Sequence, residues 1–315
     1  MNKQDLVAVV LGGPSTEAAV SRVTGGAIAQ ALREKGYNAQ EVELVPDKII
    51  PTLLDMHAKV VFNAVHGKYG EDGRLQSLLE AAGILYTGSG LLASAVSMDK
   101  VATKRFLQSE NISTPRFRII NRKQHNNLPA LKQEILQEFG VPVVIKAASQ
   151  GSSLGVYIVK KEEDIEAAIT GCFEYCYDVL IEECIIGKEL TVAMMEEDGE
   201  PIALPIIWID PHSGSYDYHS KYTKGATEYH CPAPLPEEVT KQVQDLAVAT
   251  YRVLGLKGVA RVDVMLSEDN IGYVLEANTV PGMTATSLVP KAAATMGIPF
   301  PDLCEKILLN AKKGR

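Results

Sequence analysis

The sequence of 315 residues has few of the features that mark membrane, secreted or nucleic-acid-binding proteins. No apolar run approaches the ~20 residues that span a bilayer as a helix, and the run at 6–11 is too short for the core of a signal peptide. No block of like charge occurs apart from a short basic tail at 312–315, and the formal net charge is −8. We therefore expect neither a membrane nor a nucleic acid as partner, because binding to a nucleic-acid backbone needs clustered cations.

Cysteine is also scarce. The five cysteines are odd in number and their spacing matches no metal-binding pattern, which argues against a disulfide framework or a structural zinc site. Cys172 and Cys176 stand one helical turn apart, which favours packing within a helix. We expect all five to be free thiols in a reducing cytoplasm. The apolar content of 46% is ordinary for a globular protein, and the length suggests two or three domains.

The hydrophobic pattern predicts a chain of mixed α/β and α+β class. In the first 100 residues, apolar strands alternate with helices, as expected for a doubly wound unit with an open parallel sheet. The predicted strands there are 6–11, 60–65 and 84–86, with helices at 18–35 and 74–82. Further on we expect strands at 141–146, 156–159, 178–182, 188–196 and 201–209, and helices at 98–110, 162–176, 237–254, 286–296 and 301–312. A polar stretch at 210–236 has little periodicity, and loops of that length are usually functional or disordered.

Two alternating strands near the C-terminal end carry most of the chemical information. The first contains Arg261 and Asp263, and the second contains Glu276 and Asn278, each at period-two positions that share a face. A short turn at Ile271 and Gly272 would make the strands neighbours. Asp263, Glu276 and Asn278 could then converge as oxygen ligands beside Arg261. Such ligands suit Mg²⁺ held together with substrate phosphates, whereas the alternative is a hairpin with solvent-facing acids.

Two glycine-rich turns follow strands of the N-terminal unit. The turn GGPSTE at 12–17 lacks the dinucleotide fingerprint, which makes a dehydrogenase unlikely from this feature. Glu17 begins the next helix, where it is either a simple helix-start acid or a carboxylate aimed at a substrate ammonium group. His66 opens HGKYGEDG at 66–73, after a strand end where ligands bind in open α/β sheets. It is either a binding or proton-transfer group or an ordinary loop histidine.

Three further segments suggest phosphate handling and closure of a site. Lys146 ends a strand before the turn QGSSLG at 150–155, and with Lys100 it could clamp phosphates. The loop YDYHSKYTK at 216–224 could be a lid that excludes water, or an exposed or partner-binding loop. The turn VPGM at 280–283 leads into a helix, and its backbone N–H groups could hold an oxyanion or a carboxylate.

Taken together, these motifs resemble those of D-alanine–D-alanine ligases of the ATP-grasp superfamily. In chain order they are GGPSTEAAVS at 12–21, HGKYGEDG at 66–73, MDK at 98–100, IK at 145–146, QGSSLG at 150–155, IEECIIGKE at 181–189, YHSKY at 218–222, RVD at 261–263 and LEANTVPGMT at 275–284. Each motif alone is weak, but their order and spacing are specific, and they cover nearly the whole chain.

The resemblance implies a three-domain architecture and a two-step ligation. The expected domains are an N-terminal substrate-binding domain at 1–100, a central ATP-grasp domain at 101–186 and a C-terminal catalytic domain at 187–315. ATP would phosphorylate the carboxylate of one D-alanine, and the amine of a second D-alanine would displace phosphate. The family implies roles in peptidoglycan synthesis, cell wall biogenesis and cell shape, a cytoplasmic location and a homodimer. It also implies two Mg²⁺ ions, for which Mn²⁺ can substitute, and it leaves open a monovalent cation.

Roles follow from motif positions. Glu17 would hold the ammonium of the first D-alanine, near His66. The ATP-binding residues would be Lys100, Lys146, Ser152, Ser153, Glu182, Ile185, Glu189 and Lys221. The metal ligands would be Asp263, Glu276 and Asn278. Arg261 and Gly282 would stabilise the tetrahedral oxyanion, Ser287 and Leu288 would bind the carboxylate of the second D-alanine, and Ser152 and Tyr222 would join Glu17 in closing the lid.

Three positions depart from the common pattern, and two other functions stay open. Ala147 replaces a frequent proline, Val280 replaces a frequent serine, and Glu183 replaces a lysine of some relatives, which argues against a nucleotide contact there. Pocket details would decide between D-alanine, D-serine and D-lactate as acceptor, and Tyr222 fits dipeptide synthesis. A nucleotide-binding regulator without catalysis is a further alternative, although it would have no need of the full metal set.

Overall fold

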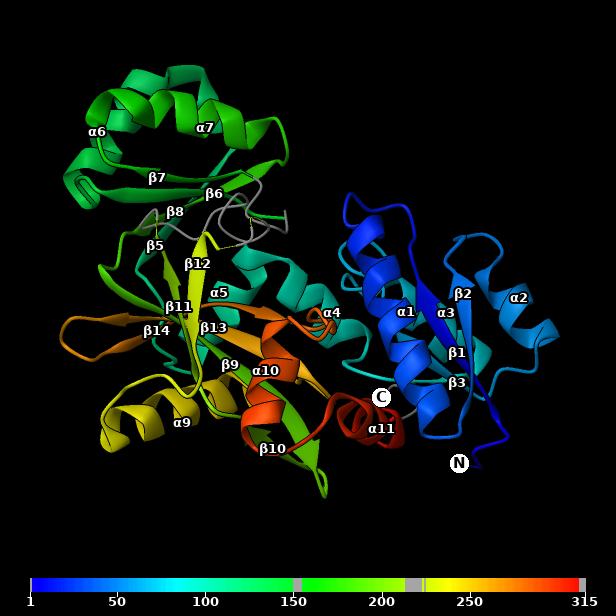
Figure 1. The fold of residues 1–315 in the computed structure, drawn as a ribbon. Helices are drawn as coiled ribbons and strands as arrows, with labels where there is room; N and C mark the ends of the chain where they lie inside the picture. The colour runs from blue at the N-terminus through cyan, green and yellow to red at the C-terminus, as the bar shows by residue number, and fades with distance from the viewer. Residues whose placement is uncertain (1, 150–154, 213–222, 224, 312–315) are drawn as a thin grey trace.

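The structure is a computed structural model that describes residues 2–149, 155–212, 223 and 225–311. Three β-sheets follow one another along the chain (Figure 1). The first is a parallel sheet near the N-terminus, the second an antiparallel sheet covered by two helices, and the third a larger sheet that carries the C-terminal strands. This arrangement confirms the expected mixed class and the open parallel N-terminal sheet.

The first sheet has the strand order β2-β1-β3-β4. Its strands are β1 (Leu6–Leu11), β2 (Asn38–Glu43), β3 (Val60–Asn63) and β4 (Leu85–Tyr86), and its helices are α1 (Ala18–Glu34), α2 (Ile49–Asp55) and α3 (Arg74–Ala82). β1 is apolar throughout because both of its faces are covered. Val7 and Val9 pack with α1, whereas Ala8 and Val10 pack with α2 and α3. β2 and α2 were not anticipated from the sequence.

The second sheet has the order β5-β8-β6-β7 and is antiparallel. Its strands are β5 (Phe117–Asn121), β6 (Val143–Ala147), β7 (Val156–Val159) and β8 (Asp178–Glu183). Helices α6 (Leu128–Glu138) and α7 (Ile165–Phe173) pack on one face of it (Figure 1). The predicted hairpin is confirmed by the pairing of Lys146 with Val156. The predicted helix 162–176 is shorter, because its first residues form a 3₁₀ turn and α7 ends at Phe173.

The third sheet has the order β12-β11-β9-β13-β14, with β10 paired to β9. Its strands are β9 (Gly187–Glu197), β10 (Glu200–Ala203), β11 (Ile207–Pro211), β12 (Thr227–His230), β13 (Ala260–Ser267) and β14 (Gly272–Asn278). Helix α9 (Glu237–Val253) covers one face, where Val243 and Ala247 pack with Val192 and Val262. The opposite face carries the polar side chains of the site. Helices α10 (Leu288–Thr295) and α11 (Phe300–Leu309) complete the described chain.

Several boundaries differ from the sequence-based expectation for local reasons. The predicted strand 201–209 forms two strands, β10 and β11, because residues 204–206, which include Pro205, are not part of the strand pairing. The hairpin turn lies at 268–271, before Gly272 rather than after it. The predicted helix 98–110 begins two residues later, as α5 (Lys100–Ser109), because the preceding helix α4 (Leu91–Met98) continues to Met98 and Asp99 separates the two. Asp99 is extended and its carboxylate caps α5 by accepting the N–H of Ala102, which makes Lys100 the first helical residue.

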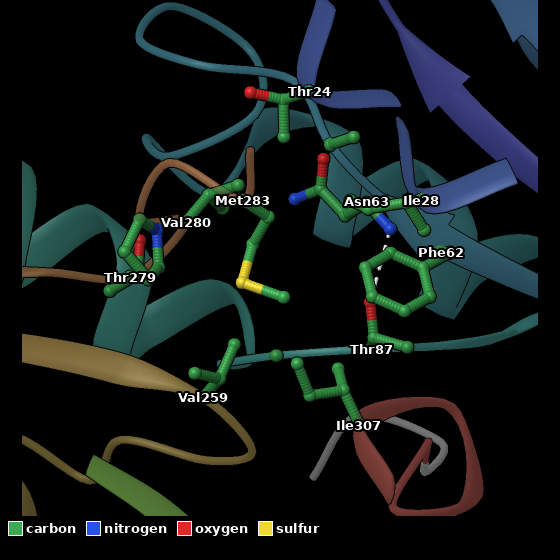
Figure 2. Close-up of a pocket in the computed structure, with 13 residues that line it drawn as sticks. Thr24, Ile28, Phe62, Asn63, Thr87, Val259, Thr279, Val280, Met283 and Ile307 are labelled. Carbon is green, nitrogen blue, oxygen red and sulfur yellow. Dashed lines mark hydrogen bonds between the residues drawn. The ribbon is translucent and has the colours of Figure 1, made fainter. Parts of the chain in front are cut away.

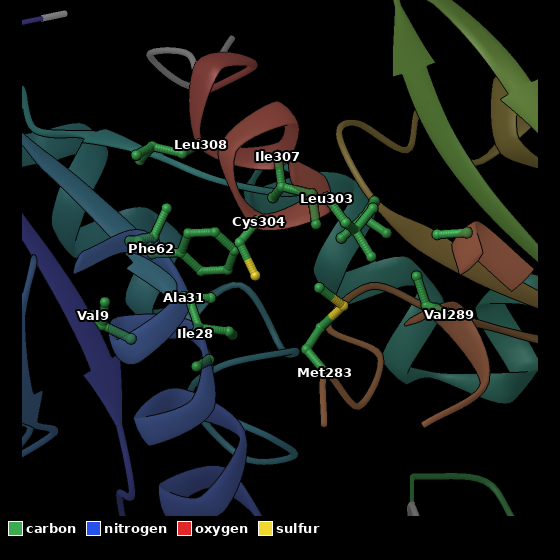
Figure 3. Packing of buried hydrophobic residues seen from close by; sticks show 14 of the residues in the cluster. Val9, Ile28, Ala31, Phe62, Met283, Val289, Leu303, Cys304, Ile307 and Leu308 are labelled. Atoms are coloured by element: carbon green, nitrogen blue, oxygen red, sulfur yellow. The ribbon is translucent and has the colours of Figure 1, made fainter. Parts of the chain in front are cut away.

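One apolar core joins the first and third sheets. Ile28 of α1 and Phe62 of β3 pack with Met283 and with Leu303 and Ile307 of α11 (Figure 3). At the rim, the ammonium of Lys35 lies 2.8 Å from Asp302 and 2.9 Å from Glu305. The loops at the ends of β1 and β3 are therefore held against the segment that follows β14. Among the helices of the described residues, none combines the length and the apolar character that crossing a membrane requires.

Candidate active site

The pairing of β13 with β14 brings the predicted oxygen ligands together. Asp263 lies opposite Glu276, and Arg261 lies opposite Asn278. The Nε and Nη2 atoms of Arg261 each donate to the Asp263 carboxylate at 2.8 Å, and the Asn278 amide donates to it at 3.0 Å. The expectation that these four side chains share one face is confirmed. The bidentate contact fixes the orientation of the Asp263 carboxylate.

A third strand supplies a contact that the sequence analysis did not anticipate. Thr191 of β9 is opposite Asp263 on its other side, and its hydroxyl donates to Asp263 Oδ1 at 2.6 Å. Thr191 is buried, with an exposed fraction of 1%. The signal was present in the sequence, because Glu189 and Thr191 are polar residues two apart in an apolar strand and so share a face. Only the strand order shows that this face adjoins Asp263.

Lys100 connects α5 to the strand that carries Glu276. Its ammonium lies 3.4 Å from Glu276 Oε2, and its backbone N–H donates to the carbonyl of Ala148 at 3.0 Å. The break at Asp99 is what places the lysine here, because it makes Lys100 the first residue of α5. A cation beside a carboxylate at this point can meet the charge of a phosphate group.

Glu182 of β8, in the second sheet, lies between two lysines. Its Oε2 is 2.6 Å from Lys146 Nζ, and its Oε1 is 2.5 Å from Lys104 Nζ. Burial opposes the charge on these groups, but mutual attraction holds the pKa of Glu182 below and the pKa of Lys146 above their usual values. The pKa of Lys104 falls to about 8, because burial outweighs the attraction of Glu182 and Lys146 adds repulsion. Lys104 was not among the expected site residues.

A cleft of about 1080 Å³ separates the second sheet from the third. It is lined by residues of β6, β7 and β8 on one side and of β9, β13 and β14 on the other. The expected site residues along it are Lys100, Lys146, Glu182, Ile185, Glu189, Asp263 and Glu276. Glu183 also lines it, but one of its oxygens accepts the backbone N–H of Arg116 at 2.7 Å. The cleft therefore presents lysines and carboxylates at one end and apolar surface along β7.

The loops of the first sheet form a second group of predicted residues. The Ser15 hydroxyl donates to the His66 carbonyl at 2.7 Å and accepts the backbone N–H of Glu17 at 3.1 Å. These two bonds tie the start of α1 to the loop after β3. Glu17 lies so close to Gly67 that a Cβ there would be 2.7 Å from its carboxylate. The glycine thus leaves space for the carboxylate that the sequence singled out.

His66 joins these loops to the segment after β14. Its Nδ1–H donates to the carbonyl of Val280 at 2.9 Å, and Nε2 lies 3.0 Å from the Thr24 hydroxyl. Burial lowers the pKa of His66, but Glu71 and Glu17 outweigh it and raise the pKa above the usual value. Beside this contact, a cavity of about 10 Å³ is enclosed by Thr24, Asn63 and Thr87 on one side and Thr279, Val280 and Met283 on the other (Figure 2).

The remaining predicted residues lie at the start of α10 or outside the described chain. The Ser287 hydroxyl accepts the backbone N–H of Thr284 at 3.0 Å and lies beside Gly282. Leu288 is the first residue of α10. Ser152, Ser153, Lys221 and Tyr222 lie outside the described residues.

The chemistry of the cleft fits a nucleotide with divalent metal. Asp263, Glu276 and Asn278 offer oxygen ligands, which suit Mg²⁺ completed by phosphate oxygens. Within the described ranges, no group of three or more His, Cys, Asp or Glu side chains is arranged to hold a metal ion by itself. A set of two carboxylates and one amide needs the phosphates of its ligand to complete the coordination. Lys100 and Lys146 at the same end of the cleft supply positive charge for those phosphates.

A parallel sheet followed by two sheets that face each other across a nucleotide-sized cleft defines the ATP-grasp class. Structural comparison gives the same class. The Bacillus anthracis D-alanine–D-alanine ligase complexed with ATP has a TM-score of 0.83 at 34% identity, covering 98% of this chain and 96% of the other. The VanG D-Ala:D-Ser ligase from Enterococcus faecalis has a TM-score of 0.81 at 28% identity, covering 96% of this chain and 98% of the other.

Sequence comparison identifies the family. Residues 47–89 match the D-ala D-ala ligase N-terminus and residues 106–309 match the D-ala D-ala ligase C-terminus. The D-alanine–D-alanine ligase of Pelotomaculum thermopropionicum is 43% identical over 304 residues, covering 96% of this chain and 95% of the relative. That of Moorella thermoacetica is 44% identical over 303 residues, covering 96% of this chain and 97% of the relative. The chain belongs to the D-alanine–D-alanine ligase family.

Proposed function

We propose that this protein joins two molecules of D-alanine to D-alanyl-D-alanine and converts one ATP to ADP and phosphate. The observation that carries the proposal is the cluster of Arg261, Asp263, Glu276 and Asn278 on two paired strands at the lysine-bearing end of the cleft. A regulator that only binds nucleotides would have no need of this whole set. The product supplies peptidoglycan synthesis, and we place the enzyme in the cytoplasm, where its ATP is made.

The reaction needs two transfers at one carboxyl group. An oxygen of the first D-alanine carboxylate attacks the γ-phosphorus of ATP, which forms an acyl phosphate and releases ADP. The amine of the second D-alanine attacks the acyl carbon, loses a proton, and phosphate leaves with the electrons of the broken C–O bond. Two Mg²⁺ ions held by Asp263, Glu276 and Asn278 would supply charge neutralisation for the phosphates. Lys100, beside Glu276, and Lys146, on the facing sheet, would hold the same phosphates.

The N-terminal loops and the start of α10 would position the amino acids. The negative charge of Glu17 matches the ammonium of the first D-alanine. The Ser15 hydroxyl connects the backbones of Glu17 and His66, which brings the two residues near each other. Ser287 and Leu288 would bind the carboxylate of the second D-alanine. Arg261 and the Gly282 N–H would stabilise the tetrahedral oxyanion. Ser152 and Tyr222 are proposed to complete the set with Glu17, and Lys221 and Ser153 to contact ATP.

The larger organisation follows the same proposal. Domains at 1–100, 101–186 and 187–315 would each contain one of the three sheets, with ATP held between the second and third and with Glu182, Ile185 and Glu189 around its adenosine. We also propose a homodimer, as the family resemblance implies. Sedimentation equilibrium that returns the mass of one chain would contradict the dimer.

The direct test measures which product the enzyme makes. Phosphate release would be followed with ATP, Mg²⁺ and D-alanine, D-serine, D-lactate or L-alanine, and products identified by mass. We expect D-alanyl-D-alanine to dominate. Mixed products with D-serine or D-lactate would instead place this chain among ligases with a different acceptor, a possibility raised by its similarity to the D-Ala:D-Ser ligase. Absence of turnover with every acceptor would refute the proposed activity.

Thr191 provides a test of the metal site that leaves every proposed ligand in place. Thr191→Val keeps the side-chain shape but removes the hydroxyl that donates to Asp263 at 2.6 Å. Loss of such a supporting contact lowers metal affinity by roughly 10- to 100-fold. We expect the Mg²⁺ concentration for half-maximal turnover to rise by about that factor. Thr250→Val is the matched control, because its buried hydroxyl bonds to a carbonyl within α9. Equal Mg²⁺ dependence in the two variants would contradict the metal assignment.

A further inference from the structure

Lys104 is the most deeply buried cation of the described chain and has no role in the reaction described above. Its side chain is 1% exposed, although it belongs to the surface helix α5. Such burial is costly for an ammonium group unless it is paired. Lys104 has three partners: the Glu182 carboxylate at 2.5 Å, the Pro115 carbonyl at 3.0 Å, and the face of the Phe117 ring at 5.4 Å.

The partners of Lys104 lead directly to the cleft. Glu182 and Pro115 both line it, whereas Lys104 does not. Lys104 therefore lies behind the residues that line the cleft and acts on it only through Glu182 and Pro115. Glu182 divides its carboxylate between this hidden lysine and Lys146, whose ammonium is 2.6 Å from the other oxygen.

Charge balance shows what the hidden lysine contributes. Lys104, Glu182 and Lys146 carry one net positive charge as a group. Without Lys104, the Glu182 charge would be balanced by Lys146 alone, and the pair would be neutral. The charge of Lys146 would then be neutralised by Glu182, so Lys146 would attract a phosphate group less strongly. The Glu182 carboxylate would also lose the contact that fixes one of its oxygens.

We infer that Lys104 is a positioning residue for nucleotide binding: from beneath the cleft it holds Glu182 in place and leaves Lys146 available to the phosphates. The inference rests on the proposed location of ATP in this cleft. It assigns no contact between Lys104 and the nucleotide. The effect of Lys104 on ATP affinity should depend entirely on Glu182, whereas a general contribution of Lys104 to folding would not.

Charged groups that face Lys104 from neighbouring elements support this view. Glu182 and Glu183 of β8 attract it, and Lys146 of β6 repels it. Burial together with that repulsion brings the pKa of Lys104 to about 8 despite the attraction of Glu182. Above this pH the ammonium loses its proton, so ATP affinity should weaken as pH rises through about 8. Lys104→Arg, which stays charged, should not show this loss.

The deciding experiment is a double-mutant cycle with the whole enzyme. Lys104→Met, Glu182→Gln and the double variant would be compared with wild type by calorimetric titration with Mg²⁺-ATP, so that no turnover is needed. We expect Lys104→Met to raise the Kd of ATP about tenfold, as loss of a charged hydrogen bond would. The KM for D-alanine should stay within about twofold, because Lys104 is remote from the amino-acid groups. The double variant should bind ATP as Glu182→Gln does, since the effect needs Glu182.

Two results would overturn the inference. One is a folded Lys104→Met variant whose Kd for ATP matches wild type. The other is a double variant that binds ATP more weakly than Glu182→Gln by the full effect of the single change, since Lys104 would then act independently of Glu182. If Lys104→Met does not fold, the double variant, which removes both buried charges, is compared directly with Glu182→Gln, and a Kd for ATP about tenfold above that of Glu182→Gln would overturn the inference. Lys35→Met is the control, because Lys35 is ion-paired with Asp302 and Glu305 away from the cleft.

These measurements separate the inference from the proposed ligase activity. Wild-type protein that binds Mg²⁺-ATP but forms no D-alanyl-D-alanine would refute the activity and leave the Lys104 test intact. Wild-type protein that makes the dipeptide while Lys104→Met binds ATP normally would refute the inference alone.

Discussion

Glu276→Gln is expected to lower kcat about 1,000-fold. Metal ions that neutralise the phosphate charge stabilise the transition state, and losing ~4 kcal/mol of this stabilisation corresponds to that factor. The substitution preserves the shape of the side chain but removes its charge. It leaves Asp263 as the one carboxylate of the proposed metal set and removes the negative charge that lies 3.4 Å from the Lys100 ammonium. Phosphate release at increasing Mg²⁺ would measure the effect. Excess Mg²⁺ should restore little activity if Glu276 also orients the phosphates.

The control for this change is a second Glu→Gln substitution in the same sheet. Glu200 of β10 pairs with Arg252 at the surface, with a largely exposed side chain. Exposed ion pairs contribute little stability, so Glu200→Gln should have wild-type activity. Thermal unfolding would establish that both variants are folded. A Glu276→Gln enzyme that keeps more than roughly a tenth of wild-type turnover would contradict the metal role.

Gly70→Ala is expected to cause the largest loss of stability from a single methyl group, at least ~3 kcal/mol. A Cβ at residue 70 would lie 1.8 Å from the carbonyl oxygen of Val65, which is backbone and cannot move aside alone. The Gly70 carbonyl also accepts the buried amides of Asn63 at 2.9 Å and Gln76 at 2.7 Å. Any shift that relieves the clash would weaken these bonds. The thermal unfolding midpoint should therefore fall by several degrees.

The same loop carries His66 and Glu71, so we also expect weaker binding of the first D-alanine by Gly70→Ala. Gly26→Ala is the matched control, because an added Cβ in α1 meets nothing within 4 Å. An alanine there should be neutral or stabilise the helix by up to ~1 kcal/mol. Equal unfolding midpoints for the two variants would contradict the prediction that a methyl group at residue 70 destabilises the fold by its clash with the backbone.

The C-terminal half of the candidate site could be predicted from sequence because its geometry is local. Residues 261–278 form one hairpin, and the period of two along each strand places Arg261 and Asp263 on the face of Glu276 and Asn278. The exact turn was misplaced, at Gly272 rather than at 268–271, yet the pairing was unaffected. A shift of one residue would have sent the carboxylates to the α9 face, which is apolar.

Boundaries were harder to predict, because single residues end elements for reasons that periodicity does not contain. Asp99 delays the start of the helix predicted at 98–110, since its backbone is extended and its carboxylate caps the turn that begins at Lys100. Pro205 likewise lies in the break that divides a predicted strand. β2 has only two buried residues in six, so its apolar signal is weak. It forms because β1 offers a partner along its whole length.

The sequence by itself determined the classes of element, the parallel type of the N-terminal sheet and the candidate set of oxygen ligands, because each follows from the periodicity of apolar and polar residues along the chain. Only the tertiary structure decided which distant groups support that set. Thr191 lies 72 residues from Asp263, and His66 lies 214 residues from Val280. Lys104 reads as an ordinary helix lysine until the fold places it under Glu182. Pairings of this kind depend on strand order and sheet packing, which no local pattern encodes.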